Sequence, residues 1–325
     1  MNVVIVGAGA VGTWFGRVLE EIGCTVTFAP RELELVLPAK PDVVVVAVKA
    51  YDTQRALLTL RALLGESSSA AILTLQNGIG NEEEFANVFG ADAVIAGALT
   101  VPIERTASGD SFAANRGGLA LAPMGKQAYN WLLAALHATP VPVTVFTDYR
   151  ALKWSKLSLN ILANASCAIL DQTPAEVLAH PGIFALEMEA LREVAAVMEA
   201  ARITRVDLPK YPVRALLTMA QAPASLTHFV LPRLIARARG GKLPSLLLDL
   251  RANKVKSEVA WLNGAVVAAA RNLHLAAPVN AAFARLLDEI TALPGRWSKF
   301  REQPEVLLAE VLLERQRWQL LPINS

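Results

Sequence analysis

The first half of the chain alternates short apolar runs with stretches of helical periodicity. Continuous apolar runs of this length are typical of strands that are buried on both faces of a parallel sheet. The helical stretches between them favour a doubly wound arrangement of strands and helices. The pattern predicts five such strands, at Asn2–Val6, Thr25–Ala29, Val43–Val48, Ala70–Leu75 and Val94–Ala98.

The pattern changes after the fifth strand. Two short runs, Phe112–Ala114 and Leu119–Ala122, are predicted to pair as a β-ribbon. A helix at about Lys126–His137 and a strand at Val143–Phe146 then complete this half. From Asp148 onward helical patterns dominate, and Thr147-Asp148 is typical of a helix N-cap. We therefore expect two domains, residues 1–147 with a sheet and residues 148–325 with helices only.

The first strand runs directly into a glycine-rich turn, Gly7-Ala8-Gly9-Ala10-Val11-Gly12, and then into a helix. In this setting a G-x-G-x-x-G turn is typical of dinucleotide binding. Gly7 allows the tight turn, Gly9 lets a pyrophosphate approach the backbone, and Gly12 lets helix and strand pack closely. The sequence therefore predicts an α/β fold with an N-terminal Rossmann-type doubly wound sheet. The alternative is a Gly-rich turn with a structural role only.

The end of the second strand bears on the choice of dinucleotide. An NAD site usually has an acidic residue there for the ribose hydroxyl, whereas this chain has Ala29-Pro30-Arg31. Arg31 could bind a 2′-phosphate through two hydrogen bonds, which favours NADP. Glu32 follows directly, and a surface arginine is the alternative.

Polar residues follow the third and fourth strands. Lys49 comes after the third strand, and Asn77 stands between the fourth strand and a glycine turn. The carboxyl edge of a doubly wound sheet is where its ligands bind. We expect both residues near a cofactor, with ordinary turn chemistry as the alternative for Asn77.

The stretch Leu152–Ile169 is the most informative part of the second half. As one helix, it aligns Lys156, Asn160 and Asn164 at successive i, i+4 positions on a helix that is otherwise apolar nearly all round. An ammonium and two amides inside such a helix need partners or a cleft. The alternative is a solvated stripe with Lys153 and Ser155 on its edge.

A second stretch, Ser257–Ala265, places a carboxylate among apolar residues. Read as a helix, it aligns Glu258 with Leu262 and Ala265, and Lys156 is then the natural partner. A glutamate held at the first turn of a helix by the dipole is the alternative. The four histidines show no metal-ligand spacing, so we expect no metal.

Composition excludes several classes of protein. Hydrophobic residues make up 54% of the chain and charged residues 18%, which describes a compact globular protein. The net charge of +2 gives no reason to expect nucleic acid, and no apolar run is long enough for a membrane span.

Cys24 and Cys167 are typical of buried thiols in a reducing, cytoplasmic compartment. The amphipathic tail after Pro294 favours packing or a homodimer surface.

Taken together, these motifs resemble the ketopantoate reductase (2-dehydropantoate 2-reductase) family. The resemblance covers roughly residues 1–290 as spaced motifs, of which the Lys-x-x-x-Asn-x-x-x-Asn stretch is the most specific. The motifs are GAGAVG, VKAYDT, LQNGIGN, KWSKLSLNILAN and SEVAWLNGAVV.

The resemblance implies an NADPH-dependent reductase of pantothenate biosynthesis, with a Rossmann domain, a helical domain and a 2-oxo acid substrate between them. It implies that Lys156 is the catalytic lysine that protonates the C2 carbonyl oxygen and that Glu258 is its acidic partner. The remaining residues that it assigns are Asn160, Asn164 and Ser245 for the substrate, and Gly7, Gly9, Gly12, Arg31, Lys49 and Asn77 for the cofactor.

The chain departs from the family pattern in four places. Only ten residues separate Arg31 from Asp42, and Pro174 and Lys242 stand at or near positions where an asparagine is expected. The spacing from Ser245 to Glu258 is about one residue longer than the family usually has. Two other functions remain open. One is a β-hydroxyacid dehydrogenase, which also combines a Rossmann domain with a catalytic lysine. The other is a cofactor-binding protein without turnover, which the shortened segment after Arg31 favours.

Overall fold

The structure is a computed structural model that describes residues 1–29, 40–65, 69–105, 111–113, 117–127, 129–223, 235 and 243–320. The chain forms two compact units. The first comprises Met1–Lys156 and Val206–Pro212, and the second comprises Leu157–Arg205 and Val213–Ser325. The division between them falls inside one helix, α5 (Tyr149–Ile161). Two domains that divide after residue 147 remain a prediction.

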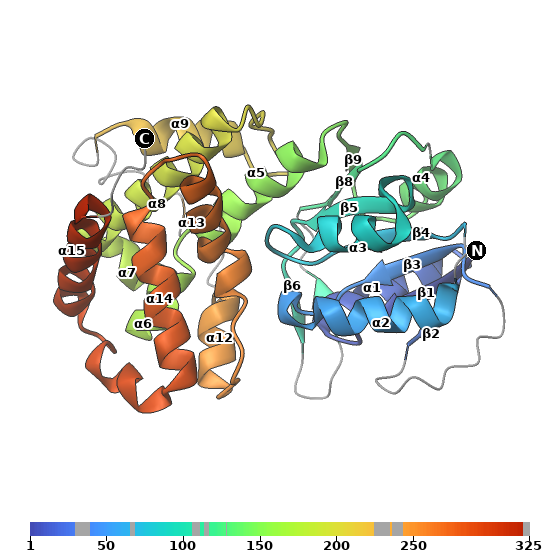
Figure 1. Cartoon of the computed structure of the whole chain (residues 1–325). Helices are drawn as coiled ribbons and strands as arrows, with labels where there is room; N and C mark the ends of the chain where they lie inside the picture. The colour runs from blue at the N-terminus through green and yellow to red at the C-terminus, as the bar shows by residue number, and fades with distance from the viewer. Residues whose placement is uncertain are drawn as a thin grey trace. The chain divides into compact units, whose positions relative to one another are not determined.

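The first unit is built on a seven-stranded sheet with the order β2-β1-β3-β4-β5-β8-β9 (Figure 1). Neighbouring strands are parallel except for β5 and β8, which are antiparallel. This is the predicted doubly wound sheet. Its strands are β1 (Asn2–Val6), β2 (Thr25–Phe28), β3 (Val43–Val46), β4 (Ala71–Thr74), β5 (Val94–Leu99), β8 (Leu119–Pro123) and β9 (Val143–Val145).

Helices cover both faces of this sheet, and the two-residue period of the strands decides which side chains they meet. Ile5 and Val45 pack in one core with α1 (Ala10–Glu21) and α4 (Asn130–His137). Val4 and Val44 point the other way and pack with α2 (Thr53–Leu64) and α3 (Asn81–Phe89). Both faces are buried, and this explains why the central strands are apolar throughout rather than alternating.

The predicted ribbon after β5 is wrong in its pairing. Strand β7 (Ser111–Ala113) pairs with β6 (Ile103–Arg105), and Leu119–Pro123 joins the main sheet between β5 and β9. Leu119 to Ala122 are all buried. A strand that is apolar on both faces must be buried on both. A position inside the main sheet, between two other strands, buries both faces, whereas a two-stranded ribbon would not.

The second unit is helical, as predicted. Helix α8 has twenty residues, and α7 begins with a capping box in which Thr173 and Glu176 bond each other's backbone N–H groups. None of the helices among the described residues is long and apolar enough to cross a membrane. Besides the end of α5, the helices in the described residues of this unit are α6 (Ala165–Leu170), α7 (Pro174–Ala179), α8 (Pro181–Ala200), α9 (Val213–Gln221), α12 (Ser245–Arg251), α13 (Asn263–Asn272), α14 (Pro278–Ala292) and α15 (Pro304–Leu320).

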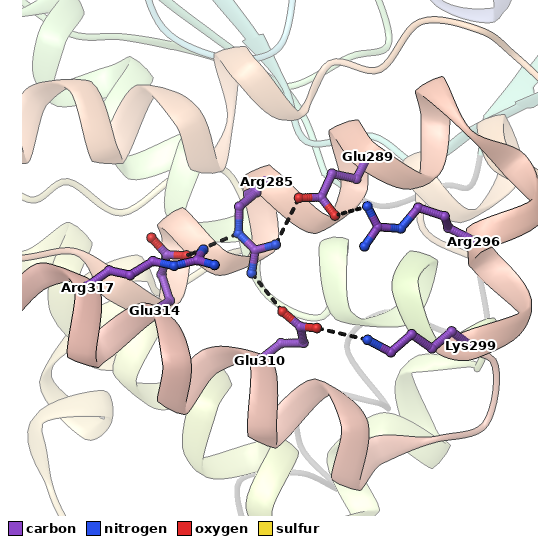
Figure 2. Close-up of polar contacts among 7 residues, drawn as sticks. All are labelled: Arg285, Glu289, Arg296, Lys299, Glu310, Glu314 and Arg317. Carbon is purple, nitrogen blue, oxygen red and sulfur yellow. Dashed lines mark hydrogen bonds and ion pairs between the residues drawn. The ribbon is translucent and has the colours of Figure 1, made fainter.

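An ion-pair cluster ties the C-terminal helix to α14 (Figure 2). The Arg285 guanidinium lies 2.9 Å from Glu289 of its own helix. It also lies 3.0 Å from Glu310 and 3.1 Å from Glu314, both on α15. Leu307 and Val311 of α15 are fully buried. The tail is therefore packed onto its own chain in this part, and the homodimer surface stays a prediction. The outer cations of the cluster are Arg296, Lys299 and Arg317.

Candidate functional site

In the glycine turn, two positions have no room for a side chain, and a third has open space beside it. Gly7 has a φ of +115°, and a β-carbon there would lie 2.7 Å from the Ala47 backbone. A β-carbon on Gly12 would lie 1.9 Å from the Gly7 carbonyl oxygen. A β-carbon on Gly9, in contrast, would meet no atom within 4 Å. The space over Gly9 is what a pyrophosphate needs to approach the backbone.

The start of α1 suits the same ligand. Gly9 is its N-cap and has no side chain to accept hydrogen bonds from the N–H groups of the first turn. Those N–H groups and the helix dipole favour an anion. The turn and the helix therefore fit the phosphates of a dinucleotide.

The loops that carry Lys49 and Asn77 are fastened to each other. Thr53, just after Lys49, accepts a hydrogen bond from the Gln76 side chain at 2.9 Å and lies 3.0 Å from Asn81 Oδ1. Asn81 in turn donates to the Asn77 carbonyl at 3.0 Å. Because Thr53, Gln76 and Asn81 are all buried, these bonds hold the two loops in a fixed relation.

A buried lysine that the sequence did not single out anchors α5 in the first unit. Lys153 is 4% exposed and lies 2.8 Å from a carboxylate oxygen of Glu82, which is 1% exposed. It also donates to the Gln76 carbonyl at 2.7 Å, and Thr74 donates to the same Glu82 oxygen at 2.6 Å. The solvated stripe with Lys153 on its edge is thereby wrong. Three consecutive glutamates at the start of α3, Glu82–Glu84, were the available signal for a buried cation.

A second contact joins the same two helices. The Tyr149 hydroxyl, at the start of α5, donates to Glu83 Oε1 at 3.2 Å. Burial raises the pKa of the Glu83 carboxyl, while burial and, to a smaller extent, the Glu83 carboxylate raise the pKa of Tyr149 to about 12. The phenol therefore stays protonated and keeps its donor. Asp148 caps α5 by accepting from the Arg150 N–H at 2.8 Å, as predicted.

Lys156 and Asn160 lie four residues apart in α5 and so share one face of it. Both are half-buried, and the neighbouring Leu157 and Ile161 are 1% exposed. This is the predicted alignment of an ammonium with an amide on one face of the helix. Pairing of Lys156 with Glu258 stays a prediction.

Asn164 does not continue that face, because the predicted single helix is wrong. Helix α5 ends at Ile161, Ala163 has a φ of 47°, and α6 starts at Ala165. The Asn164 side chain is 5% exposed and donates to the Asn160 carbonyl at 2.8 Å. Its oxygen accepts from the Leu246 N–H at 3.2 Å. At the break the Ala163 N–H donates to Glu187 of α8 at 2.7 Å, whereas in a continuous helix it would donate to the carbonyl four residues earlier.

The other two predicted residues of the second unit lie at helix starts. Ser245 is half-buried and is the first residue of α12. Glu258 is 2% exposed and stands before a short 3-10 turn, Val259–Trp261. It is not part of α13, so the helix that aligned it with Leu262 and Ala265 is also wrong. The backbone of Leu262, at φ −102° and ψ −99°, breaks the chain into two pieces there.

Two residues and one ligand class need separate mention. Arg31 and Lys242 lie outside the described residues. Pro174 is buried at the first position of α7, where its fixed φ suits a helix start. Over the described part of the chain, no three His, Cys, Asp or Glu side chains gather in a group that could hold a metal ion.

The fold and the glycine turn define a class, the NAD(P)-dependent oxidoreductases with a Rossmann-type domain and a helical unit. Two family models match the chain, "Ketopantoate reductase PanE/ApbA" over residues 34–126 and "Ketopantoate reductase PanE/ApbA C terminal" over residues 148–291. The chain belongs to the ketopantoate reductase family.

Individual relatives agree with this. The chain is 29% identical over 314 residues to a 2-dehydropantoate 2-reductase of Halobacterium salinarum, covering 86% of this chain and 95% of the relative. It is similar to the crystal structure of a PanE/ApbA family ketopantoate reductase from Ralstonia eutropha, with 26% identity, a TM-score of 0.71, and coverage of 90% and 98%. A D-mandelate dehydrogenase solved with NADH shares the fold at 18% identity and a TM-score of 0.75, with coverage of 90% and 98%.

Proposed function

We propose that the protein reduces a 2-oxo acid, 2-dehydropantoate, to the 2-hydroxy acid pantoate, and that its reductant is NADPH. The observation that carries the proposal is the pair Lys156 and Asn160 on one half-buried face of α5, in a chain of this family. A bound nicotinamide supplies the hydride for the C2 carbon. The carbonyl oxygen then needs one proton and a positive charge beside it.

In this proposal Lys156 donates that proton to the carbonyl oxygen and stabilises the negative charge that grows on it. Glu258 is its acidic partner in the site. Asn160 binds the substrate hydroxyl, and the Ser245 hydroxyl binds the carboxylate. These roles rest on the match of the residues to the family motifs and on the half-buried positions of Lys156, Asn160 and Ser245.

The cofactor residues follow the same reasoning. Gly7, Gly9 and Gly12 with the start of α1 hold the pyrophosphate, and Lys49 and Asn77 approach the nicotinamide half. Arg31 binds the 2′-phosphate, and this assignment is what favours NADPH over NADH. Titration of both dinucleotides into the wild type and Arg31→Ala measures it. A tenfold preference for NADPH corresponds to about 1.4 kcal/mol, and we expect Arg31→Ala to abolish it.

Lys156→Ala tests the central assignment. We expect kcat to fall by about 10²- to 10⁴-fold because the proton donor is lost, while the dissociation constant of NADPH changes little. Lys156→Met, which keeps the length of the side chain, should behave alike, and a small alkylamine should partly restore turnover to Lys156→Ala. Near-normal turnover in either variant would remove Lys156 from the mechanism.

Rates across a panel of 2-oxo acids separate the alternatives. Oxidation of 3-hydroxyisobutyrate with no reduction of 2-dehydropantoate would support a β-hydroxyacid dehydrogenase. NADPH binding with no turnover of any 2-oxo acid would support a cofactor-binding protein. A cytoplasmic location is part of the proposal and agrees with Cys24 and Cys167, neither of which is in a disulfide. A homodimer is proposed from the tail alone, and the molar mass in solution tests it.

A further inference from the structure

The chain between α5 and α6 holds a conformation that costs free energy. Ala163 has a φ of 47°, in the left-handed region that is unfavourable for a residue with a β-carbon. Two bonds oppose this cost. The Ala163 N–H donates to the buried Glu187, and the Asn164 N–H donates to the Ile161 carbonyl at 3.2 Å. The strained residue places Asn164 off the face of α5 and at the junction of two helices.

The carboxamide of Asn164 serves both ends of that junction. In a continuous helix the Asn160 carbonyl would accept from the backbone N–H of Asn164. Here it accepts from the side-chain Nδ2 of Asn164 at 2.8 Å, so the side chain closes the C-terminal end of α5. The Oδ1 atom of the same carboxamide points to a segment 82 residues further along and accepts the Leu246 N–H at 3.2 Å.

The start of α12 has no cap of its own. The residue in the N-cap position is Pro244, whose side chain accepts no hydrogen bond. Leu246 is the second residue of the helix, where an N-cap side chain would ordinarily bond the backbone N–H. Asn164 therefore supplies from a distance the acceptor that Pro244 lacks, and Ser245 lies directly between Pro244 and the N–H that is held.

We propose that Asn164 is a positioning residue that fixes the Ser245 hydroxyl relative to Asn160. It does so by bonding the Asn160 carbonyl with one end of its carboxamide and the Leu246 N–H with the other. The inference rests on the proposed function, in which Asn160 and Ser245 bind the 2-oxo acid. It replaces the prediction from sequence that Asn164 itself holds the substrate hydroxyl.

A double-mutant cycle in steady-state kinetics tests the coupling. Asn164→Ala should raise KM for 2-dehydropantoate about tenfold and change kcat by less than about threefold, with NADPH affinity unchanged. In the Ser245→Ala background the same change should add less than about twofold, because Asn164 acts through Ser245. If the fold-changes of the two variants multiply, Asn164 acts independently of Ser245 and the proposal fails.

Two variants serve as controls for the cycle. Asn160→Ala combined with Ser245→Ala should show fold-changes that multiply, since each side chain binds a different group of the substrate. Asn164→Asp keeps an oxygen for the Leu246 N–H but loses the donor to the Asn160 carbonyl. It should recover part of the affinity that Asn164→Ala loses, and no recovery would contradict the capping of α12.

Hydrogen exchange gives a readout that does not depend on turnover. In Asn164→Ala without ligand, amide exchange should quicken in the segment Ser245–Arg251 by about tenfold or more, while α13 keeps its protection. Unchanged protection of that segment would overturn the proposal. A wild type that binds NADPH but reduces no 2-oxo acid would instead refute the proposed function, and the exchange experiment would still decide whether Asn164 orders α12.

Discussion

Single residues of the glycine turn differ in what they contribute. A β-carbon on Gly12 collides with the Gly7 carbonyl at 1.9 Å, whereas a β-carbon on Gly9 meets nothing within 4 Å. The motif in the sequence predicts a dinucleotide turn but does not tell these two requirements apart. The contact distances distinguish them, because they show that Gly12 faces the protein's own backbone and Gly9 does not.

Alanine variants at these two positions should separate folding from binding. Gly9→Ala should change the free energy of unfolding by less than about 0.5 kcal/mol. It should weaken NADPH binding by about tenfold or more, since the methyl group takes the space of the pyrophosphate. Gly12→Ala should lower the free energy of unfolding by about 1–3 kcal/mol through overpacking. Urea unfolding and NADPH titration measure both, and tight NADPH binding by Gly9→Ala would contradict the assignment.

Helix α14 shows how one element depends on another for its start. Its N-cap is Ala277, whose side chain has no acceptor, and the buried Glu193 of α8 accepts hydrogen bonds from the Val279 and Asn280 N–H groups at 2.8 and 2.9 Å. Burial raises the pKa of the Glu193 carboxyl to about 7, although hydrogen bonds from Asn280 and Val279 work in the opposite direction. The periodicity of the sequence predicts α14. The acceptor for its first N–H groups comes from Glu193, which only the packing of α8 against α14 brings there.

This pKa predicts a pH dependence of stability. The folded chain binds the Glu193 proton more tightly than the unfolded chain, so the free energy of unfolding should fall as pH rises from about 4.5 to about 7. The contribution is about 3 kcal/mol at most. Urea unfolding across this pH range should show the fall in the wild type, with Glu193→Gln lacking that part of it. Glu199→Gln, an exposed change on the same helix, is the control, and parallel curves for wild type and Glu193→Gln would contradict the prediction.

Across the whole molecule, each unit has its own buried core, and the last helix is joined to the second unit by charge as well as by packing. Arg285 is 26% exposed and meets three carboxylates, while Arg317 is 56% exposed and meets one of them, Glu314. Hydrogen bonds from Arg285 and Lys299 hold the pKa of Glu310 below its ordinary value, although burial alone would raise it. Partly buried networks of this kind contribute more than single exposed pairs.

Neutral variants of the two arginines test the difference. Arg285→Met should lower the free energy of unfolding by about 1–3 kcal/mol, because three carboxylates then lose their shared cation. Arg317→Met should cost less than about 1 kcal/mol. Added salt screens the exposed pair first, so about 0.5 M salt should reduce the smaller effect more than the larger one. Equal losses in the free energy of unfolding for the two variants, measured by urea unfolding, would contradict the prediction that Arg285 contributes more to the cluster than Arg317.

Features that depend on neighbouring residues could be predicted from the sequence. The apolar runs of the sheet, the turn from Gly7 to Gly12 and the alignment of Lys156 with Asn160 follow from periods of two and 3.6 residues and from backbone sterics. These are local rules, and the order of residues alone determined them.

The tertiary structure decided what depends on partners distant in sequence. The carbonyl that Lys153 bonds lies 77 residues away, and the N–H that Asn164 accepts lies 82 residues away. Leu119–Pro123 pairs with the main sheet rather than with a ribbon strand. Glu187 of α8 accepts the Ala163 N–H at the break that separates Asn164 from the helix of Lys156. A buried polar group must find a partner wherever the fold brings one, and sequence spacing carries no record of that distance.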